Sequence, residues 1–166
     1  MQTINACQRG HRYRSSILHP GQKTSCPRCD RLELVALAYG DMQNPPRACR
    51  LLDFKTEGLS SAQEVVEVLE IIGSYNRFFA KVVARELLPI LPKLTHVAIG
   101  RECSPVIYAG IPYWTHQAIE WQGGGMGVRI SEEERQSRSR QFLDAMRRAD
   151  ADELSDEGYA VRAWWD

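Results

Sequence analysis

The sequence has no apolar run that approaches the roughly 20 residues needed for a membrane-spanning helix. Its first ten residues, MQTINACQRG, lack the apolar stretch of a secretory signal. Its five cysteines are an odd number and form no evident disulfide framework, which argues against a small secreted scaffold. We therefore expect a cytoplasmic protein with no membrane partner.

The chain also lacks an excess of charge of one sign, because its formal net charge is zero. The charge is unevenly placed, however. Residues 1–31 carry six basic residues against Asp30 alone, a charge of +5, and the remainder of the chain carries −5. Such asymmetry can mark an electrostatic docking surface. Chance variation along a short segment explains it equally well, so both interpretations stay open.

Three of the five cysteines cluster with a histidine in the first thirty residues. Zinc in a structural site is bound by four such ligands in a tetrahedron, usually as two short-spaced pairs on separate turns. Pro20 and Gly21 allow the intervening loop to double back. His19 is an alternative ligand to His11, although the shorter C-x3-H spacing favours His11. The candidate ligands, spaced C-x3-H-x14-C-x2-C, are Cys7, His11, Cys26 and Cys29.

The segments CQRGHRY and SCPRC resemble the treble-clef and zinc-ribbon modules of the CxxGH…CPxC type. Tyr13 stands where those modules have an aromatic residue. The resemblance implies that the same four residues bind one zinc ion. The run after Cys29, DRLELVALAYG, is too short for its periodicity to distinguish a helix from a strand. The resemblance implies that it is a helix. The resemblance covers residues 4–38, under a quarter of the chain.

We expect this zinc to be structural, since a catalytic zinc keeps an open position for water and four protein ligands close the site. The chain also has no H-x-E partner, and its Pro27 lies between the cysteines, unlike the P-C-x-x-C of zinc deaminases. Cys49 and Cys103 stand alone and are expected to be buried or inert thiols.

The predicted organisation is an α+β protein with a zinc-binding module over 1–40 and a body over 41–166. Pro45 and Pro46 suggest a joint at 40–48. Within the body, the capping-box pair of Ser61 and Glu64 opens an apolar stripe that predicts one long helix over 61–88, which Gly73 and Ser74 could bend. This broad stripe either forms part of the core, which we favour, or builds a homodimer interface.

Short β-branched runs predict strands at 95–100 and 105–110, and HQAIEWQ and MGVRI flank three glycines as a hairpin would. A second capping box, at Ser131, opens a polar helix over about 131–150, the second long helix of the body. The aromatic C-terminal tail, EGYAVRAWWD, either packs back as a final strand or docks on a partner, and we favour packing.

Five polar residues were weighed as catalytic groups. Cys103 with His116 would make a dyad, and His116 with Glu120 would suit acid–base chemistry or a second metal. None of the five lies in a motif that fixes its role, so we expect no enzyme, and a hydrolase site near His116 and Glu120 ranks third among the functions. The residues are His96, Glu102, Cys103, His116 and Glu120.

The leading functional hypothesis is a non-enzymatic, regulatory zinc-finger protein that binds nucleic acid, or nucleic-acid-processing machinery, through its basic zinc module. Lys and Arg side chains would neutralise phosphates and release counterions, and an aromatic ring beside them could stack on an unpaired base. The alternative is a protein–protein interaction module, or an inhibitor of a host enzyme of the transcription, replication or defence machinery, in which the zinc is purely structural. The predicted nucleic-acid contacts are Arg9, Arg12, Tyr13, Arg14, Lys23, Arg28 and Arg31.

Overall fold

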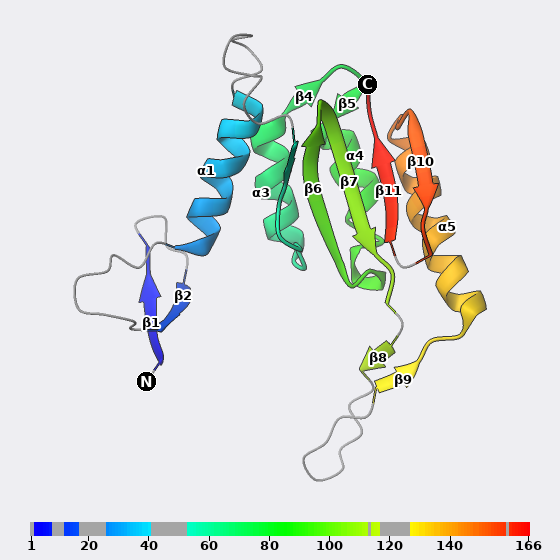
Figure 1. The fold of residues 1–166 in the computed structure, drawn as a ribbon, viewed down its shortest axis with the longest axis horizontal. Coiled ribbons are helices and arrows are strands. Elements are labelled where there is room, and N and C mark those ends of the chain that lie inside the picture. Colours follow the sequence, from blue (N-terminus) through cyan, green and yellow to red (C-terminus); the bar gives the residue numbers. More distant parts are fainter. Residues whose placement is uncertain are drawn as a thin grey trace.

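The computed structural model of the chain (Figure 1) describes residues 2–7, 12–16, 26–40, 53–112, 114–116, 127–158 and 160–166. These residues form helices and antiparallel sheets, so the predicted α+β class is confirmed. Across the described residues, each helix is too short or too polar to cross a bilayer.

A five-stranded antiparallel sheet forms the centre of the fold, with the strand order β10-β11-β7-β6-β3. The two predicted strands are confirmed as its neighbours β6 and β7, in a register that pairs Ile99 with Ile107. Side chains alternate across a strand, so these two and Val161 of β11 share the face that packs into the core. The strands are β3 (Asp53–Lys55), β6 (His96–Glu102), β7 (Ser104–Gly110), β10 (Glu153–Asp156) and β11 (Ala160–Trp164).

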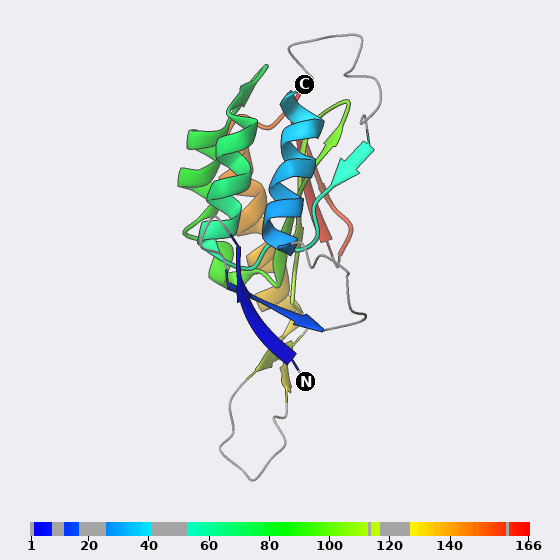
Figure 2. The ribbon, with the colours of Figure 1, turned by 90° about the vertical axis from the view of Figure 1, so that its left-hand side faces the viewer.

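Helices cover one face of this sheet (Figures 1 and 2) and leave the other face without a helix among the described residues. They contact one another in the order α1, α3, α4, α5, and α5 also contacts β10 and β11. Burial of their apolar stripes against the sheet is the main stabilising contribution. Their bounds are α1 (Pro27–Gly40), α3 (Ala62–Ile72), α4 (Ala80–Leu87) and α5 (Glu132–Arg148), and a 3₁₀ turn, η2 (Leu91–Lys93), follows α4.

The prediction of one long helix over 61–88 is wrong. The predicted capping box of Ser61 and Glu64 is present, but the helix ends at Gly73, whose φ is +68°. A small hairpin of β4 (Ser74–Tyr75) and β5 (Phe78–Phe79) then separates α3 from α4. The expectation of two long helices in the body is therefore not met, because only α5 among the described helices, with 17 residues, is long.

The hairpin is favoured because it buries an aromatic side chain that a continuous helix would have placed elsewhere. Asn76 takes a φ of +47° in its turn, a conformation that asparagine tolerates well. The turn directs Phe78 into the core with no exposed surface, edge-on to Trp165 at a ring-centroid distance of 5.0 Å. Such aromatic pairs contribute about 0.5–1.5 kcal/mol beyond the area that they bury.

The C-terminal tail packs back into the fold, as favoured. Strand β11 lies inside the sheet, between β10 and β7, and Trp165 is fully buried with its Nε1–H donating to the carbonyl of Ala149 at 3.0 Å. The alternative, a tail that docks on a partner, is therefore wrong. The polar helix is also confirmed as α5, which Ser131 caps by accepting a hydrogen bond from the N–H of Glu134.

Two further hairpins lie outside the main sheet. Part of the predicted hairpin is present as β8 (Trp114–His116) paired with β9 (Gly127–Arg129), whereas residues 117–122, the rest of its predicted first strand, lie outside the described residues. The glycines themselves, and the predicted joint after residue 40, lie outside the described residues. The N-terminal hairpin consists of β1 (Gln2–Ala6) and β2 (Arg12–Ser16).

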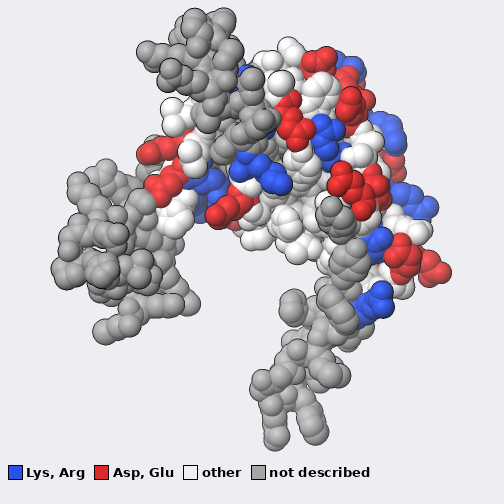
Figure 3. Space-filling model, in the orientation of Figure 1, with Lys and Arg blue, Asp and Glu red and all other residues white. Residues whose placement is uncertain are grey.

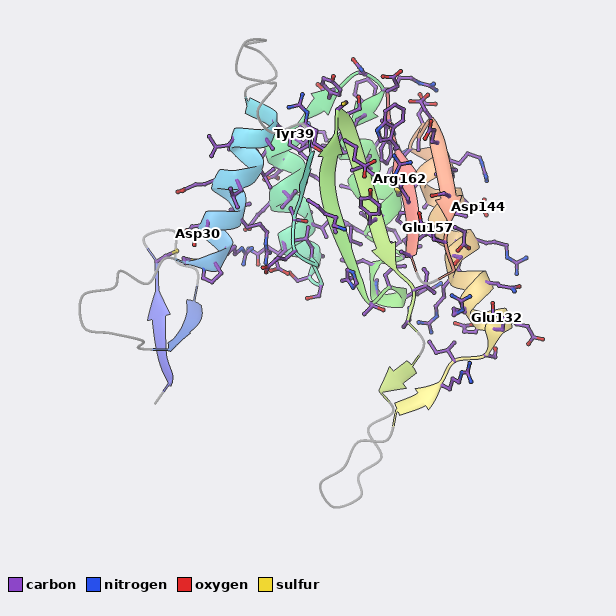
Figure 4. The ribbon with its side chains drawn as sticks, in the orientation of Figure 1. Asp30, Tyr39, Glu132, Asp144, Glu157 and Arg162 are labelled. Carbon is purple, nitrogen blue, oxygen red and sulfur yellow. The ribbon has the colours of Figure 1, made fainter. Side chains whose placement is uncertain are left out.

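Helix α1 belongs to the same hydrophobic core as the body. Val35 and Ala38 are fully buried in that core. At its C-terminal end, the hydroxyl of Tyr39 donates to the carbonyl of Gly100, and Arg101 donates to the carbonyl of Ala38 at 2.8 Å (Figure 4). Burial raises the pKa of Tyr39, so its hydroxyl stays a donor. The C-terminal end of α1 is therefore tied to strand β6.

Candidate metal centre

Three cysteines meet where the N-terminal hairpin reaches the start of α1. Ala6 pairs with Arg12 at the end of the hairpin, and Cys7 follows directly on β1. Cys26 precedes α1, and its carbonyl accepts a hydrogen bond from the N–H of Asp30 at 3.0 Å. Cys29 lies in the first turn of α1. The predicted helix after Cys29 is thus confirmed, and the start of this helix brings Cys26 and Cys29 to one place.

The spacing of the three sulfur atoms suits a single ion. The Sγ atoms of Cys7 and Cys29 are 3.6 Å apart, and all three sulfurs lie within 4.8 Å of one another. A zinc ion with Zn–S bonds of about 2.3 Å in a tetrahedron places its sulfurs about 3.8 Å apart. A disulfide needs about 2.05 Å instead. These three cysteines could therefore hold a metal ion.

The electrostatics of the cluster favour a cation as well. Burial raises the pKa of the Cys29 thiol to about 12, and hydrogen bonds with Cys7 and Cys26 add to the shift, as does the nearby charge of their thiolates. Three thiolates in one partly buried place repel one another, so the cluster ionises fully only when a positive charge joins it. A divalent ion reverses this balance, since a coordinating thiol is deprotonated.

The remaining predicted residues of the module are only partly placed. His11, its alternative His19, Arg9 and Lys23 lie outside the described residues. Three further predicted nucleic-acid contacts lie on the described strand β2: Arg12, Tyr13 and Arg14.

The last two predicted nucleic-acid contacts, on α1, form ion pairs with α3. Arg28 makes two hydrogen bonds to the carboxylate of Glu67, at 2.6 and 2.5 Å, and Arg31 contacts Glu64 at 2.8 Å. The four side chains are between 17% and 24% exposed. The hydrogen bond to Glu67 outweighs desolvation and raises the pKa of Arg28.

Sequence reasoning did not identify these acidic partners. Glu64 was noticed only as part of a capping box, and Glu67 not at all. The signal that could have found them is a matched spacing: the arginines and the glutamates are each three residues apart, as befits two antiparallel helices in contact. That signal is readable only once the contact between α1 and α3 is known.

The polar residues weighed for catalysis are dispersed. His96 and Cys103 flank opposite ends of the seven-residue strand β6, about 20 Å apart for a strand of this length. Cys103 is exposed rather than buried. Glu102 accepts hydrogen bonds from Tyr108 and from Arg162, the latter at 2.6 Å.

The proposed dyad partners are placed no better. His116 lies on β8, where it pairs with Gly127. Glu120 lies outside the described residues. Of the candidates whose side chains the structure describes, His96 lies at the other end of β6 from Glu102 and Cys103.

Charges on the sheet face opposite the helices are mixed. Figure 3 shows acidic and basic side chains interspersed over the described part of this face. Arg162, labelled in Figure 4, contacts both Glu102 and Glu153, and the ammonium of Lys55 lies 4.8 Å from the ring centre of Tyr108. The basic side chains on the described part of this face are therefore interspersed with acidic ones and in part paired with them.

Comparison with known proteins gives no relative: no protein-family model, curated protein or solved structure matches the chain.

Proposed function

We propose that the cysteine cluster is a structural zinc site that binds one Zn²⁺ ion, with His11 as the fourth ligand. The three-thiol geometry carries this proposal. His11 directly precedes Arg12 in the chain, and Arg12 pairs with Ala6, the residue before Cys7. Both ends of the segment that connects β1 to β2 therefore carry a ligand. Four protein ligands leave no open position for water, so the ion would brace the fold rather than react. The proposed ligands are Cys7, His11, Cys26 and Cys29.

We further propose that the protein is a non-enzymatic zinc-finger protein of a regulatory kind, and that it binds nucleic acid through the N-terminal hairpin. The ion would fix the turn of the hairpin to the start of α1 and so present β2 in a defined orientation. Arg12, Tyr13 and Arg14 are consecutive residues of β2, so this one strand carries two arginines and an aromatic residue. Arginine neutralises phosphates, and an aromatic ring can stack on an unpaired base.

The ion pairs of α1 reduce the number of residues that we propose as phosphate contacts. Arg28 and Arg31 are already neutralised by carboxylates of α3, so releasing them to a phosphate would leave two partly buried acids without partners. The proposed phosphate contacts are therefore the basic residues that precede α1: Arg9, Arg12, Arg14 and Lys23.

Native mass spectrometry of the full chain before and after chelation tests the metal site. We expect one zinc per chain in the wild type and no stoichiometric zinc in Cys29→Ser. Cys103→Ser is the matched control, because it removes an exposed thiol outside the cluster and should keep the ion. A wild type without zinc, or equal loss in both variants, would contradict the proposal.

Fluorescence anisotropy on single- and double-stranded oligonucleotides of mixed sequence tests the nucleic-acid role separately. Arg12→Gln and Arg14→Gln should each lower the slope of log affinity against log salt by about 1. Arg28→Gln should leave the slope unchanged because Glu67 holds that side chain. If the protein holds zinc but binds neither oligonucleotide at low salt, the proposal of a metal site stands and the proposal of nucleic-acid binding fails. The hairpin would then be expected to contact a protein partner.

A further inference from the structure

An apolar groove runs between α3 and α4 on the side of the helical layer away from the sheet. It has a volume of about 430 Å³. Val66 and Leu69 of α3 line one wall, and Ala80 and Ala84 of α4 line the other. The apolar surface of the two helices therefore extends outside the core, since Val66 and Ala84 are only partly buried. The groove is separate from the metal centre and from the hairpin proposed to bind nucleic acid.

Phe79 stands at the edge of this groove with 53% of its surface exposed. It is the only aromatic residue among the large apolar side chains that are exposed in the described part of the chain. Its exposure follows from β5, where alternation buries Phe78 and so directs Phe79 outward. One surface thus carries a projecting ring beside a hollow that a ring could fill.

The rim of the groove carries one charge of each sign. Glu70 of α3 lies on one side and Lys81 of α4 on the other. Neither forms an ion pair within the described residues, whereas most other charges on the helical layer are paired. A two-fold axis through the groove would place Glu70 opposite the Lys81 of a second copy, and Lys81 opposite its Glu70, because an isologous interface exchanges contacts in this way.

We propose that the occupant of this groove is a second copy of the chain, in an isologous homodimer built on α3, α4 and the β4–β5 hairpin. Each Phe79 would enter the groove of the other copy, and two Glu70–Lys81 pairs would close its rim. A foreign peptide of one sign would meet only one of the two rim charges. The zero net charge of the chain also removes long-range repulsion between copies.

Sedimentation equilibrium of the full zinc-loaded chain over a range of concentrations tests the proposal. We expect the wild type to dimerise and Phe79→Ala to weaken the dimer at least about tenfold, as truncation of a central aromatic anchor does. Glu70→Lys and Lys81→Glu should each weaken it about tenfold, because each replaces two attractions with two repulsions. The double variant Glu70→Lys/Lys81→Glu exchanges the partners and should restore the dimer.

Glu57→Lys is the control for the change of charge, since Glu57 is exposed and lies away from the groove, and it should dimerise as the wild type does. Circular dichroism checks that each variant is folded. We expect all of them to fold, because all four substituted positions are exposed. A wild type that stays monomeric at all concentrations would overturn the proposal. So would a dimer that Glu70→Lys weakens but the double variant fails to restore.

Discussion

The ion pair between Arg28 and Glu67 gives a sharp test of how α1 is used. Its two hydrogen bonds, at 2.6 and 2.5 Å, join the guanidinium and the carboxylate as a fork, which is the strongest geometry that such a pair adopts. The side chains are 24% and 22% exposed, so solvent screens the pair less than it screens an ordinary surface pair. The perturbation is to replace Arg28, Glu67 or both by glutamine.

The expected magnitude follows from this geometry. Exposed pairs couple by about 0.2–1 kcal/mol. A charge-assisted, bidentate pair is roughly twice as strong as a neutral contact, so we expect a coupling free energy of about 1–2 kcal/mol between Arg28 and Glu67. Either single substitution should lower the free energy of unfolding by about 2 kcal/mol, because it leaves the other charge partly buried without its partner. The double substitution should cost less than the sum of the two.

A double-mutant cycle measured by urea unfolding of the full chain gives this coupling. Arg140→Gln serves as the control, because Arg140 is exposed on α5 and donates only to a backbone carbonyl within the described residues. A coupling below about 0.3 kcal/mol would refute the argument that α3 holds Arg28, because that value is within the scatter for independent sites. If Arg28→Gln also lowered the salt dependence of nucleic-acid binding, Arg28 would belong among the phosphate contacts.

Two further perturbations test the core and the pH dependence. Trp165→Ala should lower the free energy of unfolding in urea by about 3–5 kcal/mol, and Trp165→Phe by less, since it keeps the contact with Phe78 and loses mainly the hydrogen bond to Ala149; equal, small losses would show that the C-terminal strand is not part of the core. Burial opposes ionisation of Glu64, but hydrogen bonds from Arg31 and Ser61 outweigh it and lower its pKa below the ordinary value of 4.5. The unfolded chain therefore takes up this proton first as the pH falls, so the stabilisation is complete above about pH 5 and is lost below it. Glu64→Gln should flatten that decline, and an unchanged acid limb of stability against pH would contradict the assignment.

Local signals predicted the elements whose stability is local. The pair of Ser61 and Glu64 marked the start of α3, and Ser131 marked the start of α5, because a cap acts within three residues. Strands β6 and β7 were also predicted correctly, since β-branched runs bounded by turn residues are typical of strands. The short spacing of Cys26 and Cys29 is a local signal of the same kind, and the structure brings these two residues together with Cys7.

The same signals indicated a possible bend at Gly73 and Ser74, but they did not predict that the helix ends there. Apolar residues continue at helical spacing through this region, and a glycine within a helix costs only about 1 kcal/mol. What decides the conformation is the burial of Phe78 against Trp165, a residue 87 positions later in the chain. Tertiary packing of this kind outweighs local propensity, and one sequence gives no sign of which distant side chain will be met.

The same limit applies to the charge of the first 31 residues. These residues carry a net charge of +5 in the sequence, and this count predicted that the whole N-terminal module is basic. In the fold, two of these basic residues are neutralised. Arg28 and Arg31 form ion pairs with carboxylates of α3 that lie 39 and 33 positions away in the sequence. A charge count along the sequence therefore overstates the field that a partner would meet.

Helix α1 connects the candidate metal centre to the rest of the molecule. Cys26 directly precedes it and Cys29 lies in its first turn, Arg28 and Arg31 tie its N-terminal half to α3 by ion pairs, and its last turn is hydrogen-bonded to β6 through Tyr39 and Arg101. The core that includes α1 lies beyond the cluster, so loss of a metal ion would release the hairpin and leave the sheet and its helices packed. The ion would then set the position of the hairpin and contribute little to the stability of the body, which is the division of roles that a presenting zinc finger requires.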